Sequence, residues 1–119
     1  MIQRISTIEP DEKQRAAASG IEFSPDGNHL FVTNAGINTV IIYDVDKETG
    51  VLTPLFHCKT SGDYPKAVAV MPDNKHFIVL SHETDEIFIY NMNYEDCYFL
   101  QDSRPIKIEQ PNCIFIHKL

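Results

Sequence analysis

An internal repeat constrains this sequence more than any other feature. Residues 20–33 (GIEFSPDGNHLFVT) align without a gap with residues 67–80 (AVAVMPDNKHFIVL), at an offset of 47 positions. A third copy begins near the end of the chain, where residues 111–116 (PNCIFI) align with residues 65–70 (PKAVAV). Periods of this length are typical of β-propeller blades, which cannot bury their faces alone and must stack on neighbours.

Each repeat is predicted to contain four short strands. The segments 25–27 (PDG) and 72–74 (PDN) predict tight turns, because proline presets φ and Gly or Asn accepts a positive φ. A polar segment with a closing glycine, residues 46–50 (DKETG), predicts a hairpin. The expected strands are 20–24, 29–33, 39–45 and 51–58 in the first repeat, and 67–71, 76–80, 86–92 and 97–101 in the second.

The third expected strand of each repeat is apolar on both faces. Residues 40–45 (VIIYDV) and 87–92 (IFIYNM) place apolar side chains at successive positions, with Tyr43 aligned to Tyr90. A sheet with one wet face would alternate apolar and polar residues, so these sheets are expected to be covered on both sides. Stacked blades and a β-sandwich both provide such cover, and the fixed period favours blades.

The predicted fold class is therefore all-β, a partial propeller of two four-stranded antiparallel blades with flanking strands. The blades are expected at 19–64 and 65–110, and residues 111–119 are expected to be the first strand of a closing blade. Residues 2–8 are expected to be an isolated fourth strand, and residues 11–19 a long loop with at most one helical turn. Propellers close with about four to eight blades, so the sequence predicts the C-terminal part of a longer ring.

The two outer blade faces would then be exposed apolar patches. Such patches promote association, so the chain made alone is expected to be insoluble or oligomeric through these faces.

The net charge and the cysteine content exclude several classes of function. Lys plus Arg number 10 and Asp plus Glu 17, a net charge of −7, which argues against nucleic-acid binding. No apolar run reaches the roughly 20 residues of a membrane span, and no secretion signal is recognisable at the N-terminus.

Cys58, Cys97 and Cys113 lack a Cys-x-x-Cys pair, so reduced thiols in a cytoplasmic protein are expected, with Cys97–Cys113 pairing as the alternative. We expect no metal and no cofactor, because no metal-ligand spacing or nucleotide-binding motif occurs.

Candidate binding residues lie in the connections at one end of the expected sheets. Asn34 could present its amide to a ligand, or it could simply support a turn. Lys66 could meet an anionic group, or it could be a solvated lysine. His82 beside Glu83 could act as a base with its partner, or both could be polar residues of a loop tip. Asn112 completes the set, whereas the other histidines, His29, His57, His76 and His117, are assigned to blade architecture and packing.

Four motifs in order resemble a known family, the 6-phosphogluconolactonase-like lactonases. Residues 24–40 (SPDGNHLFVTNAGINTV) resemble its signature SPDG-x-x-LY-x-SNRG-x-x-S-I, and residues 49–52 (TGVL) its TG-x-L hairpin. Residues 62–66 (GDYPK) are similar to its G-x-x-PR segment, and residues 111–113 (PNC) to its P-x-C strand.

The resemblance implies a seven-bladed ring that hydrolyses sugar lactones without a metal, within carbohydrate metabolism. Lys66, Asn34, His82 and Asn112 would then bind a small-molecule lactone, while the catalytic residues are unassigned because most would come from other blades. Ala35 replaces the arginine of the family motif, and Lys66 replaces a second arginine without its bidentate geometry. The alternative is a non-catalytic propeller fragment or a protein-interaction scaffold, and the chain alone is expected to be inactive.

Overall fold

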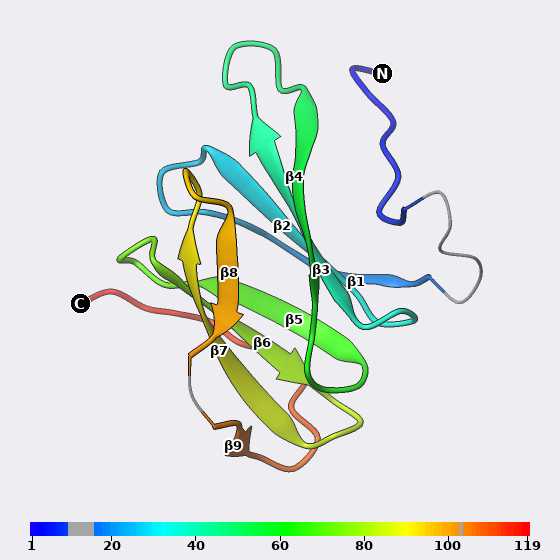
Figure 1. Ribbon diagram of the computed structural model, residues 1–119, viewed down its shortest axis with the longest axis vertical. Coiled ribbons are helices and arrows are strands. Elements are labelled where there is room, and N and C mark those ends of the chain that lie inside the picture. The colour runs from blue at the N-terminus through cyan, green and yellow to red at the C-terminus, as the bar shows by residue number, and fades with distance from the viewer. Residues whose placement is uncertain (10–15, 103) are drawn as a thin grey trace.

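The computed structural model describes residues 1–9, 16–102 and 104–119, and the regular structure of these residues is entirely β (Figure 1). Sheet 1 is an antiparallel meander in the order β1-β2-β3-β4. Its strands are β1 (Ala18–Phe23), β2 (His29–Asn34), β3 (Thr39–Val45) and β4 (Leu52–Lys59).

Sheet 2 repeats this arrangement with one addition. It contains β5 (Pro65–Val70), β6 (His76–Ser81), β7 (Glu86–Asn93), β8 (Tyr98–Gln101) and β9 (Ile106–Lys107). The short strands β8 and β9 both pair with β7, so together they form its interrupted outer neighbour. All eight predicted strands of the two repeats are confirmed, and only β9 was not predicted. The molecule is a partial propeller.

The repeat is preserved in the register of the strands. Tyr43 pairs with Leu30 in sheet 1, and Tyr90 pairs with Phe77 in sheet 2. These two pairs are related by the same 47-residue offset as the sequence repeat. Equivalent positions in the sequence are therefore equivalent positions in the two sheets.

The innermost strands of the two sheets lie next to each other. The Ser19 hydroxyl donates a hydrogen bond to the Pro65 carbonyl at 2.6 Å, which links β1 to β5. A Cβ on Gly20 would lie 3.1 Å from the Ala67 Cα and 2.8 Å from the Thr33 Oγ1. Glycine at position 20 therefore permits the close approach of the two strands.

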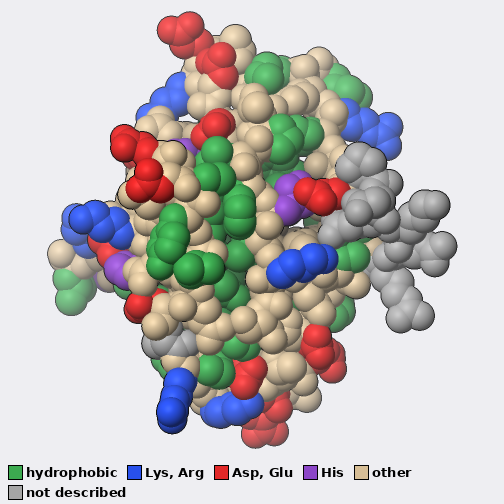
Figure 2. All heavy atoms as spheres, viewed as in Figure 1, with side chains coloured by type: hydrophobic (Ala, Val, Ile, Leu, Met, Phe, Trp, Pro, Cys, Tyr) green, Lys and Arg blue, Asp and Glu red, His purple; other side chains and the backbone are tan. Residues whose placement is uncertain are grey.

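A shared hydrophobic core joins the sheets. Phe31, Val40 and Ile42 of sheet 1 belong to the same buried cluster as Phe77 and Tyr90 of sheet 2. The rings of Phe31 and Phe77 lie 5.3 Å apart. In the view of Figure 2, many hydrophobic side chains gather along the middle of the molecule, and charged side chains are scattered over the face around them.

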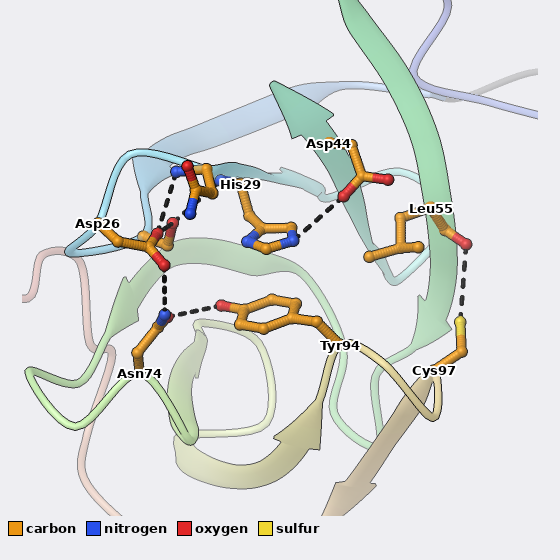
Figure 3. A network of polar contacts seen from close by, with 9 residues as sticks. Asp26, His29, Asp44, Leu55, Asn74, Tyr94 and Cys97 are labelled. Atoms are coloured by element: carbon orange, nitrogen blue, oxygen red, sulfur yellow. Dashed lines mark hydrogen bonds and ion pairs between the residues drawn. The ribbon is translucent and has the colours of Figure 1, made fainter. Parts of the chain in front are cut away.

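A polar network also crosses between the sheets (Figure 3). The His29 ring of β2 stacks on the Tyr94 ring at 3.6 Å with an interplanar angle of 4°, and its Nε2 lies 3.1 Å from Asp44. The Tyr94 hydroxyl donates to the Asn74 side chain at 2.8 Å, and Asn74 donates in turn to Asp26 at 2.9 Å. This network couples the turns of the two repeats.

The flanking segments differ from the sequence prediction. Residues 2–8 form no strand, although Ile5 packs on sheet 1 and the Ser6 carbonyl accepts a hydrogen bond from Tyr43 at 2.8 Å. Residues 111–119 also form no strand. A strand requires a ladder partner, and no described residues supply the neighbouring strand that either segment would need. Of the predicted loop at 11–19, residues 11–15 lie outside the described residues, and Ala18 and Ser19 belong to β1.

Candidate functional site

The β2–β3, β4–β5 and β6–β7 connections gather at one end of the two sheets. Asn38 organises them: its amide accepts a hydrogen bond from the Tyr64 backbone N–H at 2.9 Å and donates to Asp63 at 2.7 Å. The Tyr64 carbonyl accepts a hydrogen bond from the His82 backbone N–H at 3.0 Å. The β2–β3, β4–β5 and β6–β7 connections therefore form one continuous surface, as the meander topology predicts.

The segment that follows β9 joins the same surface. The Ile108 N–H donates to the Asp85 carbonyl at 2.9 Å, and the Gln110 N–H donates to the Asp85 carboxylate at 2.8 Å. These two bonds bring Pro111 and Asn112 next to the β6–β7 connection. Two predicted binding residues, His82 and Asn112, are thereby brought to the same place.

A β-bulge directs Lys66 towards this surface. Pro65 pairs with Ser81 and Ala67 with Leu80, so Lys66 is the extra residue of β5. Bulges re-aim a side chain and are frequent beside functional sites. The Lys66 ammonium donates a hydrogen bond to the Asn112 side-chain oxygen at 2.6 Å.

The charge of Lys66 is not neutralised by a carboxylate among the residues that the structure describes. Its recorded partner is the neutral amide of Asn112, whereas Lys107 forms an ion pair with Glu86 at 2.5 Å. An ammonium group has three N–H donors, and one of them is used here. Lys66 therefore combines a positive charge with donors left for an anionic ligand.

His82 lies beside the Lys66–Asn112 pair. Its Nδ1 is 3.2 Å from the Pro111 carbonyl oxygen, and Pro111 directly precedes Asn112. A carbonyl can only accept a hydrogen bond, so Nδ1 carries the proton and Nε2 of the neutral ring is left as an acceptor. The Tyr64 ring lies 6.3 Å from the His82 ring. His82 thus offers an oriented base at the edge of the site.

Asn34 occupies a different environment from the other three candidates. It is fully buried, its side-chain oxygen accepts the Ala17 N–H at 2.7 Å, and its amide donates to Thr7 at 3.4 Å. Ala35, also buried, donates its N–H to the Ala17 carbonyl at 2.8 Å. In the described part of the chain, no hydrogen bond joins Asn34 to the Lys66–Asn112 pair. The structure therefore gives Asn34, the last residue of β2, a buried supporting position beside the residue that precedes β1.

Sequence reasoning did not identify Asn38 and Tyr64 as organisers of this surface. Both residues have a positive φ, 56° and 61°. Asn38 lies in the β2–β3 connection within the first repeat, and Tyr64 lies in the β4–β5 connection between the two repeats. An Asn in a loop is a common turn residue, so the sequence contains no signal that its amide holds a segment 26 residues away.

Among the described residues, no group of three His, Cys, Asp or Glu side chains is placed so that it could hold a metal ion. In residues 1–9, 16–102 and 104–119, no helix is of the length and apolarity required to cross a membrane. The three cysteines are free, so the alternative Cys97–Cys113 disulfide is not formed.

Comparison with known proteins places these features in a family. The model of the family described as "Lactonase, 7-bladed beta-propeller" matches residues 1–116. The chain is 22% identical over 119 residues to the 6-phosphogluconolactonase of Bacillus subtilis (strain 168), covering 99% of this chain and 34% of that protein. It is 28% identical over 120 residues to a probable 6-phosphogluconolactonase of Arthroderma benhamiae, covering 95% of this chain and 30% of that protein. The chain thus spans about a third of the length of these relatives.

Solved structures agree with this assignment. A putative 6-phosphogluconolactonase from Bacteroides fragilis superimposes with a TM-score of 0.78 at 26% identity, over 92% of this chain and 31% of that one. The fold is also that of the periplasmic gluconolactonase of Pseudomonas aeruginosa, with a TM-score of 0.82 at 20% identity, over 89% of this chain and 30% of that one. Repeat, strand register and comparisons agree, and the chain belongs to the lactonase family of seven-bladed β-propellers.

Proposed function

We propose that this chain contributes part of the substrate-binding end of a sugar-lactone hydrolase. The observation that carries the proposal is the Lys66–Asn112 hydrogen bond of 2.6 Å, with His82 beside it, on the surface formed by the connections. The relatives named 6-phosphogluconolactonase support a phosphorylated sugar lactone as the substrate class. They also favour a catalytic role over that of an interaction scaffold.

The proposed chemistry is the addition of water to the lactone carbonyl. The bond between the carbonyl carbon and the ring oxygen breaks, and a hydroxy acid is released. Lys66 would bind an anionic group of the substrate, and Asn112 would hold the Lys66 ammonium in place and contact the same group. The His82 Nε2 would accept a proton from the attacking water. Asn34 would support the site from behind through its bonds to Ala17 and Thr7.

The test uses a ring in which the remaining blades are supplied. The segment of the Bacillus subtilis 6-phosphogluconolactonase that aligns with this chain is replaced by this chain, and hydrolysis of 6-phosphogluconolactone is measured above the spontaneous rate. In this chimera, Lys66→Met should lower kcat/KM by about 10- to 100-fold, because a hydrogen bond to a charged group contributes about 1.5–3 kcal/mol. Lys75→Met is the matched control, since Lys75 lies in the β5–β6 turn at the opposite end.

A folded chimera that does not accelerate hydrolysis would contradict the proposal. Equal losses in Lys66→Met and Lys75→Met would exclude a specific role for Lys66. The cytoplasmic location predicted from the reduced thiols belongs to the same proposal, and localisation of a tagged chain by cell fractionation tests it.

A further inference from the structure

Lys66 and Asn112, which bind each other at the proposed site, occupy equivalent positions of successive repeats. Residues 64–66 (YPK) align with residues 110–112 (QPN) at an offset of 46 positions. In each segment the proline is buried, whereas Lys66 is half-buried and Asn112 is exposed. The repeat therefore brings one polar side chain to the site from each segment, and the 2.6 Å hydrogen bond joins the two.

The residue before each proline has an unusual backbone conformation. Tyr64 has a φ of 61°, and Gln110 has a φ of 44°. A positive φ is uncommon for residues other than glycine, and a proline favours an extended conformation in the residue before it. Such strain persists only where surrounding contacts over-determine it, and strained residues are concentrated at functional sites.

A side-chain oxygen from the preceding connection holds each of these strained residues. Asn38 accepts the Tyr64 N–H at 2.9 Å, and the Asp85 carboxylate accepts the Gln110 N–H at 2.8 Å. Asn38 and Asp85 are equivalent at the 47-residue offset, and both have a φ of 56°. This loop clamp, a side-chain oxygen on the N–H before the proline, is therefore built in both repeats. Its shared property is the acceptor oxygen and not a charge.

The loop clamp of Asp85 directly precedes residues that contact the site. The Asp85 main-chain carbonyl also accepts the Ile108 N–H at 2.9 Å, so the segment is held at two points. The residues that follow are Pro111, whose carbonyl oxygen lies 3.2 Å from the His82 Nδ1, and Asn112. A segment held in this way keeps both groups in fixed positions.

We propose that Asp85 and Asn38 are positioning residues of the anion-binding site, and that their loop clamps set the places of Asn112 and Lys66. This rests on the proposed function, which assigns Lys66 and Asn112 to an anionic group of the substrate. The clamp residues themselves have no contact with the substrate in this proposal. They preorganise the site, because the ammonium and the amide are in place before the ligand arrives and binding need not order these segments.

The test measures the binding of 6-phosphogluconate, the hydrolysis product, to the chimera with the Bacillus subtilis relative, by calorimetry. Asp85→Gly removes the acceptor oxygen, and glycine accepts the positive φ without strain. The dissociation constant should rise about three- to tenfold, the effect of one lost hydrogen bond, and Asn38→Gly should act in the same direction. Asp85→Asn keeps an acceptor oxygen, as Asn38 does at the equivalent position, and should bind like the unchanged chimera.

Asp73→Gly is the matched control. The Asp73 side chain accepts the Lys75 N–H at 2.8 Å in the β5–β6 turn at the opposite end of the sheet. This variant loses a similar hydrogen bond, which urea unfolding of both glycine variants checks, but its dissociation constant should not change. In a Lys66→Met background, Asp85→Gly should have a smaller effect than in the unchanged chimera, because the clamp acts through the Lys66–Asn112 pair.

The possible outcomes separate this inference from the proposed function. Equal binding by Asp85→Gly and the unchanged chimera would overturn the inference and leave the hydrolase proposal intact. An equal loss in Asp73→Gly, or in Asp85→Asn, would also overturn it, because the effect would not come from the acceptor oxygen of a loop clamp. A chimera that shows the expected dependence on Asp85 but hydrolyses no lactone would support the inference and contradict the proposed function. A folded chimera that binds no 6-phosphogluconate would overturn both.

Discussion

At the scale of single residues, the repeat extends to individual hydrogen bonds. Asp26 accepts the Asn28 N–H at 3.0 Å, and Asp73, at the equivalent position of sheet 2, accepts the Lys75 N–H at 2.8 Å. The predicted turns therefore form for the expected reason, since an Asp side chain satisfies the backbone two residues further on. Only Asp26 also accepts a hydrogen bond from Asn74 of the other repeat.

Asp26 should make the free energy of unfolding depend on pH in the acidic range. Burial raises its pKa, but hydrogen bonds from Ser24 and Asn28 outweigh burial and hold the pKa below its usual value of 3.8. The resulting stabilisation is complete above the unfolded-state pKa and is lost as pH falls through the lower folded-state pKa. Asp26→Asn should lower the free energy of unfolding at pH 7 by about 1 kcal/mol and make the decline below about pH 4 shallower.

This prediction is checked by urea unfolding between pH 2 and pH 7. Glu22→Gln, at an exposed position in β1, is the control and should leave the acid dependence unchanged. The explanation fails if Asp26→Asn and the unchanged chain lose stability in parallel as pH falls.

Cys58 should be unreactive in the folded protein. Burial raises the pKa of its thiol to about 11, so at pH 8 only about one thiol in a thousand is the nucleophilic thiolate. Cys97 and Cys113 are exposed. Iodoacetamide at pH 8 should add two groups to the native chain and three after unfolding, as measured by intact mass. A third adduct formed at the same rate as the first two would show that Cys58 is accessible.

At the scale of elements, the strands and turns follow from local sequence, whereas the flanking segments do not. The predicted strand at 39–45 coincides with β3, because its run of apolar, mostly β-branched residues and the neighbouring turns are sufficient to define it. Residues 2–8 carry apolar residues only at every third position and remain without a ladder. They nevertheless contact the tyrosine that the repeat would place there. The Tyr43 hydroxyl donates to the Ser6 carbonyl, and the Tyr90 hydroxyl of the next repeat accepts the Ser61 N–H.

The contact between the β5–β6 turn and Tyr94 should give a measurable coupling energy between these two elements. Tyr94→Phe removes the 2.8 Å hydrogen bond to Asn74 but keeps the stacking on His29, so it should lower the free energy of unfolding by about 1 kcal/mol. In an Asn74→Gly background, which tolerates the positive φ of 54° at this position, the same change should have almost no effect. Urea unfolding of the four variants gives the coupling energy, and a value of zero would refute the contact.

At the scale of the whole molecule, the two sheets share one core and should unfold together. Phe31 is fully buried and contacts both Phe77 and Tyr94 of the second repeat. Phe31→Ala should therefore cost about 3–5 kcal/mol and reduce hydrogen-exchange protection in both sheets. Ile21→Ala, at an exposed position of β1 in the same sheet, is the control and should cost much less. Loss of protection confined to β1–β4 would show that the sheets are independent.

The sequence by itself determined the period, the eight strands, the turns and the family, because each depends on patterns within a few residues or on repetition of such patterns. It also placed Lys66, His82 and Asn112 in connections at the same end of the sheets. Only the tertiary structure decided that Lys66 binds Asn112, that Asn34 at the end of β2 is buried and that residues 2–8 and 111–119 form no strands. These features depend on contacts between segments far apart in the chain and on which ladder partners exist, and neither leaves a local pattern in the sequence.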